Sequence, residues 1–413
     1  MTSIKEKKAK KRVRQYIDQN IVKKVYSNKA VDKVAWVVGS TPPPLTIEME
    51  RLRYKAPHHP SLKEIFKART RLAAEMYLTR TCALNCLGCS VPTYIRWGKE
   101  EKRTCQEWQK LIIELKERGL KAVKFIGGEV GFIPWLPDVV KTALNHDLVA
   151  TVFTDGIPFL RKPERLERLY ELSDGKVILY TSLDFLPPRK KLTSKAALNP
   201  ETSRAYKAQE ALKFIDQAID FGFPVVAHMM VFAGNYNLIE KIYQKVTQHG
   251  AKFSIGTMQV DCHLYQGRNP KNYAQALTKK HRSKIKQQML KLLKIEDKNV
   301  KAGRRTFVNS RAHLASLHTE GINPKVDCNN RLGPPAVFAV MPNHDLRHCP
   351  VIQTLDQVKQ CQGCSYAVFR DSDPERAKFL KEKGIYKPKK GVVDFPSLIY
   401  PTEENNQLEK LYE

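Results

Sequence analysis

The sequence feature that most constrains the fold is a regular alternation, from Arg71 onward, of short apolar runs with amphipathic stretches that end in glycine. This alternation predicts a repeated unit of one β-strand and one α-helix. The apolar runs are rich in Val, Ile, Phe and Tyr and almost continuous, which is typical of parallel strands covered on both faces. The predicted strands cover residues 72–79, 121–126, 148–154, 176–183, 223–232 and 251–258.

The helices between these strands are marked by helical spacing of apolar residues and by their ends. Thr104 and Glu107 have the spacing of a capping box, and Gly119 follows the last turn of the same helix. Asn237 and Glu240 are predicted to cap a later helix in the same way. Six consecutive βα units favour an α/β fold, either a barrel or a partial barrel of the TIM type. Its active site would lie at the carboxyl ends of the strands.

The charge of the chain is unevenly distributed. The 413 residues include 71 Lys and Arg against 42 Asp and Glu, a formal net charge of +29. Most of the excess lies in residues 1–28, 279–305 and 376–390. This balance disfavours a site built mainly to collect cations and favours anionic partners. Residues 279–305 also have apolar side chains at helical spacing, which predicts a basic amphipathic helix for RNA, an acidic peptide or a membrane surface.

The composition divides the chain into five segments. We expect a basic N-terminal accessory segment, the βα core, a basic helical connector, a small cysteine-rich module and a C-terminal tail. The N-terminus lacks the apolar core of a secretory signal, and no run approaches the roughly 18 apolar residues of a membrane span, so a cytoplasmic protein is expected. The boundaries of the segments are 1–70, 71–270, 271–327, 328–370 and 371–413.

Three cysteines follow the first predicted strand at CxxxCxxC spacing: Cys82, Cys86 and Cys89. The chain has 9 cysteines, an odd number, and is far too long to be a small disulfide scaffold. Three thiolates on one loop can hold three irons of a cubane and leave the fourth iron open. Zinc fits this set less well, because structural zinc takes four ligands and catalytic zinc usually includes His or a carboxylate.

Four further cysteines lie close together near the C-terminus. Cys328, Cys349, Cys361 and Cys364 could complete either a [4Fe–4S] cluster or a tetrahedral zinc site. The residues alone leave both metals open.

At this point the sequence resembles the radical S-adenosylmethionine (SAM) superfamily, over roughly Arg71 to Val260. The resemblance implies a partial (β/α)6 barrel of the TIM type. It also implies a [4Fe–4S] cluster whose open iron chelates SAM, and cleavage of SAM to a 5′-deoxyadenosyl radical. It also implies an external one-electron donor such as a flavodoxin or ferredoxin. Gly88 departs from the pattern, because the residue before the third cysteine is often aromatic in the family. Glycine there is also met in the adenosylhopane-forming members.

Later strand ends resemble other motifs of the family. Gly127-Gly128-Glu129 resembles the GGE motif that binds the methionine amine of SAM, and Thr154-Asp155-Gly156 stands where many members have Thr-Asn-Gly. Polar residues after the fourth and fifth strands resemble those near the ribose and the adenosyl group. The cofactor-binding residues that the resemblance implies are Gly127, Gly128, Glu129, Thr154, Ser182, Asp184 and Asn235.

The far cysteines resemble a SPASM or Twitch module, most closely the single-cluster Twitch version. Such a module implies a second, auxiliary [4Fe–4S] cluster for electron transfer. His344-Asp345 replaces the usual turn Asp-Gly. Cys262, after the sixth strand, is a candidate hydrogen donor to a substrate radical, although a solitary cysteine is more often a small packed hydrophobe.

Two functions are therefore compared. The first is a radical SAM enzyme, of the oxidoreductase or peptide-modifying kind, that acts on an unidentified small molecule, lipid or peptide. The second is a nucleic-acid-binding protein with structural cysteine metal sites and basic segments that contact phosphates. Aromatic residues are sparse in the basic segments, which gives little support to stacking on single-stranded bases.

Overall fold

The computed structural model describes the core of the chain and several flanking pieces. Cys262, Cys328, Cys349, Cys361 and Cys364 lie outside the described residues, and so do residues 1–60 and 348–413. The predictions made for these parts remain predictions. The described residues are 61–68, 73–84, 86, 89, 103–188, 190–197, 202–257, 277–309, 311–321, 337–342 and 346–347.

A parallel sheet forms the centre of the molecule. Its six successive strands lie side by side in chain order, each hydrogen-bonded to the one before it. The predicted partial (β/α)6 barrel is therefore confirmed, and every predicted strand is found with its ends within about two residues. The strands are β1 (Ala73–Thr79), β2 (Ala122–Gly127), β3 (Val149–Phe153), β4 (Ile178–Ser182), β5 (Val225–Val231) and β6 (Lys252–Thr257).

Two short strands extend this sheet beyond β1. β7 (Val337–Val340) pairs with β1 in parallel, and β8 (Leu346–Arg347) pairs with β7 in the antiparallel sense. The sequence patterns place this stretch in the cysteine-rich module of residues 328–370 and do not predict that it joins the main sheet. The Twitch assignment itself stays a prediction.

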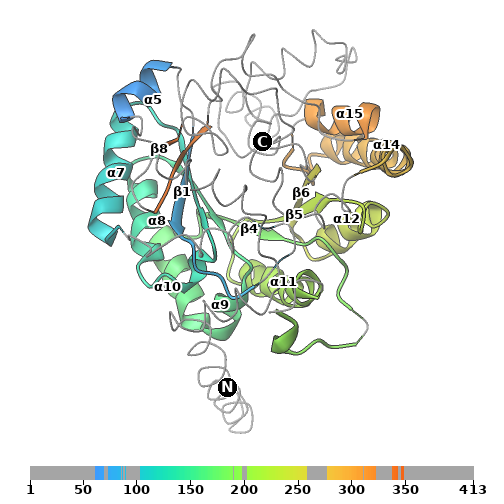
Figure 1. Cartoon of the computed structure of the whole chain (residues 1–413), viewed down its shortest axis with the longest axis horizontal. Helices are drawn as coiled ribbons and strands as arrows, with labels where there is room; N and C mark the ends of the chain where they lie inside the picture. Colours follow the sequence, from blue (N-terminus) through green and yellow to red (C-terminus); the bar gives the residue numbers. More distant parts are fainter. Residues whose placement is uncertain are drawn as a thin grey trace, which may run out of the picture.

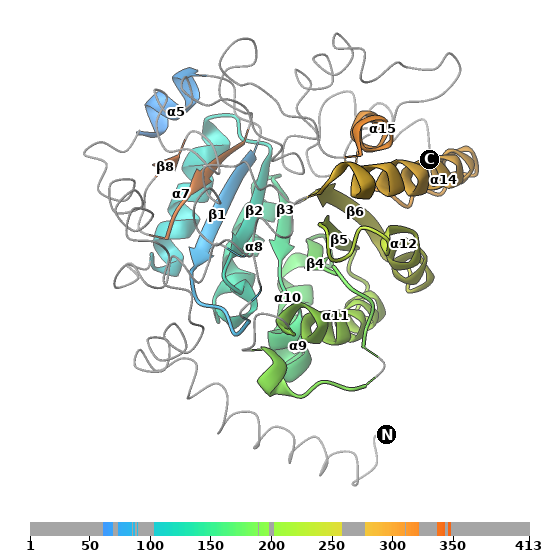
Figure 2. The ribbon, with the colours of Figure 1, turned by 45° about the vertical axis from the view of Figure 1, so that its right-hand side comes forward.

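Helices cover the convex face of the sheet (Figures 1 and 2). No helix in the described part of the chain is long and apolar enough to cross a membrane. The bounds are α5 (Leu62–Ala68), α7 (Cys105–Glu117), α8 (Leu136–Asn145), α9 (Ile157–Arg161), α10 (Pro163–Ser173), α11 (Ser203–Asp220), α12 (Ile239–Gln248), α14 (Lys279–Lys301) and α15 (Arg311–Glu320), with short 3-10 turns η2 (Val130–Phe132) and η3 (Ser194–Ala197).

Alternate residues of each strand serve the two faces of the sheet. Met76 and Phe125 pair in register and belong to the main apolar core with the helices. Glu75 and Lys124 also pair in register, and by strand alternation they lie on the opposite, concave side. Their Oε1 and Nζ atoms are 3.7 Å apart, and neither side chain is exposed. Burial raises the pKa of Glu75 and lowers the pKa of Lys124, so the barrel interior holds an ionisable pair.

The N-terminal cap of α7 agrees with the sequence pattern, and that of α12 differs from it. The capping box before α7 is confirmed: the Thr104 hydroxyl accepts from the amide of Glu107, whose carboxylate accepts from the amide of Thr104. The predicted cap pair of Asn237 and Glu240 is wrong. α12 has Leu238 as its N-cap, because the amide of Leu238 closes a turn onto the carbonyl of Asn235.

Gly156 ends the turn after β3. We expect its replacement by alanine to destabilise the fold more than the same change at Gly119. The φ of Gly156 is +78°, and an added Cβ would lie 2.3 Å from Cγ of Phe214 on α11. Gly119 has φ +92° but no atom within 4 Å of an added Cβ, so it is the matched control. We expect Gly119→Ala to lower the free energy of unfolding by about 1 kcal/mol through backbone strain alone. Gly156→Ala should lower it by about 3 kcal/mol, since overpacking adds to the strain.

Denaturant unfolding of both variants measures this difference. Equal losses in the two variants would show that α11 does not pack tightly on the turn after β3.

Candidate functional site

The cysteine loop begins where β1 ends. Cys82 and Cys86 are half-buried, and Cys89 is exposed. The amide of Cys89 donates to the carbonyl of Cys86 at 3.1 Å, and the amide of Leu84 donates to Sγ of Cys82 at 3.4 Å. The loop thus turns back on itself and keeps its three thiols at the carboxyl edge of the sheet.

The three thiols lie close enough for their charges to interact. Burial raises the pKa of Cys82, and the Asp155 carboxylate and the thiols of Cys86 and Cys89 raise it further. A thiolate at this position therefore needs a compensating positive charge, from a metal or from nearby cationic side chains.

The predicted glycine pair holds this loop to the sheet. The amide of Gly128 donates to the carbonyl of Thr79, and the amide of Glu129 donates to the carbonyl of Thr81, each at 2.7 Å. A Cβ on Gly127 would lie 2.2 Å from the oxygen of Thr79, and one on Gly128 would lie 2.0 Å from the oxygen of Thr81. Only glycine permits so close a contact. Gly127 and Gly128 therefore pack against the backbone at the start of the protein's own cysteine loop.

Glu129 joins the ends of β2 and β3. Its side chain is buried, and its carboxylate accepts from the amide of Gly131 at 2.7 Å, the hydroxyl of Thr154 at 2.6 Å and the amide of Asp155 at 2.5 Å. Burial, together with the Asp155 carboxylate, raises the pKa of Glu129. The structure thus brings Glu129 and Thr154 together, and it shows that the Glu129 carboxylate already binds both turns.

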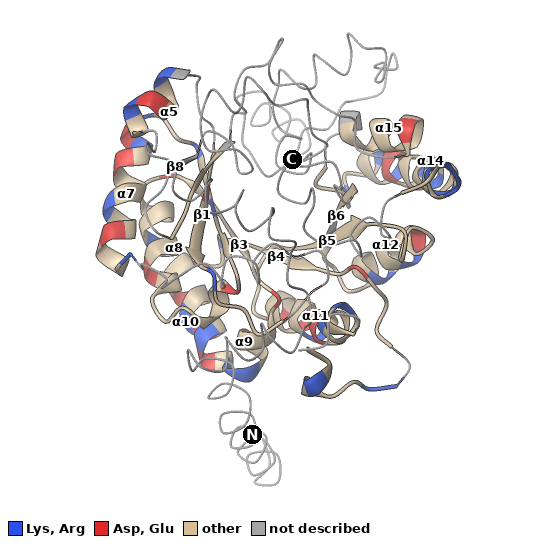
Figure 3. Ribbon diagram, viewed as in Figure 1, with Lys and Arg blue, Asp and Glu red and all other residues tan. Residues whose placement is uncertain are grey.

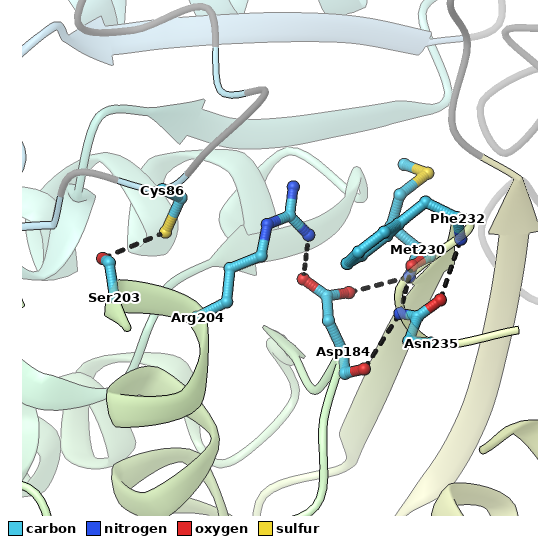
Figure 4. Close-up of polar contacts among 7 residues, drawn as sticks. All are labelled: Cys86, Asp184, Ser203, Arg204, Met230, Phe232 and Asn235. Carbon is cyan, nitrogen blue, oxygen red and sulfur yellow. Dashed lines mark hydrogen bonds and ion pairs between the residues drawn. The ribbon is translucent and has the colours of Figure 1, made fainter. Parts of the chain in front are cut away.

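Asp184 forms the corresponding junction on the other side of the site (Figure 4). One carboxylate oxygen accepts from the amide of Met230 at 2.9 Å and the other from Nη1 of Arg204 at 2.5 Å. Burial alone would raise the pKa of Asp184, but the Arg204 guanidinium, together with Lys207 and the amide of Met230, outweighs this effect and lowers it. The guanidinium also lies 4.9 Å from the centre of the Phe232 ring. Asp184 therefore fixes a half-buried cation.

Both the amide nitrogen and the amide oxygen of the Asn235 side chain form hydrogen bonds with the backbone around it. Its Nδ2 donates to the carbonyls of Asp184 and Met230, both at 2.9 Å, and its Oδ1 accepts from the amide of Phe232 at 2.8 Å. Ser182 lies at the end of β4, in register with His228 of β5. The contacts of Ser182, Asp184 and Asn235 with a ribose or adenosyl group stay predictions.

Sequence reasoning missed the first turn of α11, which lies against the cysteine loop. The hydroxyl of Ser203 is 3.6 Å from Sγ of Cys86. Burial alone would lower the pKa values of Arg204 and Lys207, but Cys86 and Asp184 raise both. The only sequence signal was the spacing of the two cations, which places them on one helix face.

These residues fit an iron–sulfur cubane. Within the described residues, no three His, Cys, Asp or Glu side chains are grouped closely enough to hold a single metal ion. A cubane does not need such a group, because each cysteine binds a different iron. The cations of α11 would offset the negative charge of its thiolates. Cys82, Cys86 and Cys89 are the residues that would hold it.

Curated relatives match part of the chain. The PqqA peptide cyclase of Bradyrhizobium diazoefficiens is 38% identical over 105 residues, which cover 25% of this chain and 26% of that protein. The PqqA peptide cyclase of Streptomyces rochei is 32% identical over 80 residues, which cover 19% of this chain and 22% of that protein. The match thus spans about a quarter of the length of these relatives.

Solved structures resemble the chain at low sequence identity. SuiB of Streptococcus suis has a TM-score of 0.47 and 14% identity, and the alignment covers 84% of this chain and 86% of SuiB. The structure of anSMEcpe with bound AdoMet has a TM-score of 0.47 and 15% identity, with coverage of 70% and 78%.

The model of the radical SAM superfamily matches residues 76–246. This range runs from within β1 to the end of α12 and includes the cysteine loop, the Glu129 junction and the Asp184 junction. The chain is therefore similar to the radical SAM superfamily over residues 76–246.

Proposed function

We propose that the chain is a radical SAM enzyme that acts on a peptide. In this proposal Cys82, Cys86 and Cys89 bind a [4Fe–4S] cluster. When bound, the cluster and SAM supply a one-electron cleavage of the C5′–S bond that yields methionine and a 5′-deoxyadenosyl radical. The observation that carries the proposal is the placement of the three thiols beside the half-buried cations of α11, Arg204 and Lys207, inside a region that matches the superfamily.

The charges around the thiols suit the zwitterionic amino-acid end of SAM. Arg204 and Lys207 form a cationic side on α11, where a guanidinium has enough N–H donors to hold both Asp184 and a substrate carboxylate. Glu129 and Asp155 form an anionic side at the ends of β2 and β3. Oδ2 of Asp155 is buried and has no hydrogen-bond partner among the described residues. An ammonium group would supply the missing donor.

The peptide substrate is supported by the names of the curated relatives, which are peptide cyclases. The remaining parts of the proposal concern residues that the structure does not describe. An auxiliary cluster at Cys328, Cys349, Cys361 and Cys364 would carry electrons, and an external donor such as a flavodoxin or ferredoxin would supply them. Cys262, which follows the sixth strand in the sequence, is the proposed hydrogen donor to a substrate radical.

The exposed face of α14 is the proposed contact for an acidic segment of the substrate. Its apolar side, with Ile285, Met289 and Leu292, is buried against the protein, so it has no free apolar face to insert into a bilayer. Its exposed positions are rich in lysine, and much of α14 is blue in Figure 3. The helix contains no Phe, Tyr or Trp, which disfavours stacking on nucleic-acid bases. The exposed lysines of α14 are Lys279, Lys280, Lys284, Lys291, Lys294, Lys298 and Lys301.

Removal of the three loop cysteines tests the proposal directly. The triple variant Cys82→Ala/Cys86→Ala/Cys89→Ala should lose about four irons per chain and all formation of 5′-deoxyadenosine. Cys105→Ala is the matched control, because Cys105 is also half-buried but lies in the first turn of α7. Iron content and chromatographic detection of 5′-deoxyadenosine measure both effects. Cleavage of SAM by the triple variant would refute the radical SAM function.

Arg204→Gln tests the cationic side. Loss of a charge-assisted hydrogen bond costs about 1.5–3 kcal/mol, so the Kd for SAM should rise about ten- to a hundredfold. Arg168→Gln is the control, since Arg168 pairs with Asp138 at the surface, and it should leave the Kd unchanged. Calorimetry on cluster-loaded protein measures the affinity, and a melting curve shows that the variant is folded. Unchanged affinity in folded Arg204→Gln would place the methionine carboxylate elsewhere.

Glu129→Gln tests whether this side chain also holds the site together. The amide NH2 of glutamine would face a hydrogen-bond donor in place of an accepting oxygen, because Glu129 accepts from Gly131, Thr154 and Asp155. We expect the free energy of unfolding of the apoprotein to fall by about 1–3 kcal/mol. Denaturant unfolding without cluster or SAM isolates this effect. Wild-type stability in Glu129→Gln would show that the three hydrogen bonds do not join the two turns.

A further inference from the structure

We infer that Ser203 tunes the reduction potential of the cluster by donating a hydrogen bond to the thiolate of Cys86. This inference rests on the proposed function and concerns a residue that lies outside the cysteine motif and the glycine turn. It assigns to the first residue of α11 a role in setting how readily the cluster is reduced.

The contact joins two parts of the chain that are far apart in sequence. The hydroxyl oxygen of Ser203 lies 3.6 Å from Sγ of Cys86, across 117 residues (Figure 4). This distance is within the range of a hydrogen bond to sulfur, whose radius is larger than that of oxygen. A cysteine that binds iron has lost its proton, so the hydroxyl of Ser203 is the donor.

The position of Ser203 is fixed by the turn that begins α11. The hydroxyl of Thr202 donates to the carbonyl of Ala196 at 3.0 Å, and the amide of Tyr206 donates to the carbonyl of Thr202 at 2.9 Å. Ser203 itself has no exposed surface, and Cys86 is half-buried. Competition from water is therefore weak, which strengthens a hydrogen bond between them.

The electrostatic effect of this contact has a definite sign. Reduction adds one negative charge to the cluster, and hydrogen bonds to its sulfurs stabilise the more negative state. The N-terminal end of an 18-residue helix adds positive partial charge at the same place. Arg204 and Lys207 act in the same direction, but each also interacts with Asp184. Ser203→Ala removes the hydroxyl that contacts Cys86 and leaves both cations in place.

The test is a redox titration of the full chain, reconstituted without oxygen and followed by electron paramagnetic resonance. The signal that changes on addition of SAM belongs to the cluster with an open iron, which separates it from any second cluster. We expect Ser203→Ala to shift the midpoint potential of this signal to more negative values, with iron content and SAM affinity unchanged. Ser203→Thr keeps the hydroxyl and should restore the wild-type potential.

Ser173→Ala is the matched control. Ser173 is also buried, but its hydroxyl faces the carbonyl of Tyr170 on α10, so the potential should not move. Equal potentials in Ser203→Ala and wild type would overturn the inference, as would an equal shift in Ser203→Thr. If wild type shows no signal that responds to SAM, the proposed function fails first.

A second measurement covers the case in which Ser203→Ala does not retain its cluster. In the wild-type protein, exchange into D2O should shift the Fe–S(Cys) stretching bands in the resonance Raman spectrum, because the donated proton is exchangeable. Bands that do not move on exchange would overturn the inference.

Discussion

The site depends on the main-chain contact between the end of β1 and the turn after β2. Two hydrogen bonds of 2.7 Å, from Gly128 to Thr79 and from Glu129 to Thr81, fix the start of the cysteine loop on the neighbouring strand. The contact is possible only because Gly127 and Gly128 have no side chain. Without it the loop would lack a defined position, and the three thiols would not stay beside α11.

Two polar junctions on either side of this contact set the charge of the site. Glu129 ties β2 to β3 with three accepted hydrogen bonds, and Asp184 ties β4 to β5 and to Arg204. Each junction is buried, so each carboxylate acts in surroundings where charges are weakly screened. One junction leaves an anionic side near Cys82, and the other holds the cations of α11. The same residues therefore support the fold and, in the proposed function, bind the zwitterionic end of SAM.

Sequence reasoning predicted the parts of this architecture that local patterns encode. The parallel strands follow from continuous apolar runs, and the capping box at Thr104 and Glu107 follows from local spacing. The cysteine loop and the glycine turn were found for the same reason. Ser203 and Arg204 were missed because their role depends on where α11 packs, which no local pattern records. Residues 337–340 were missed as a strand of the main sheet because their pairing with β1 spans most of the chain.

The central claim is that the loop of Cys82, Cys86 and Cys89 holds a cubane with an iron open to SAM. The most direct measurement is the electron paramagnetic resonance spectrum of the reduced, reconstituted protein with and without SAM. The account predicts that SAM changes the g-values of one signal, because its amine and carboxylate bind the open iron. A spectrum that stays the same on addition of saturating SAM would contradict the account.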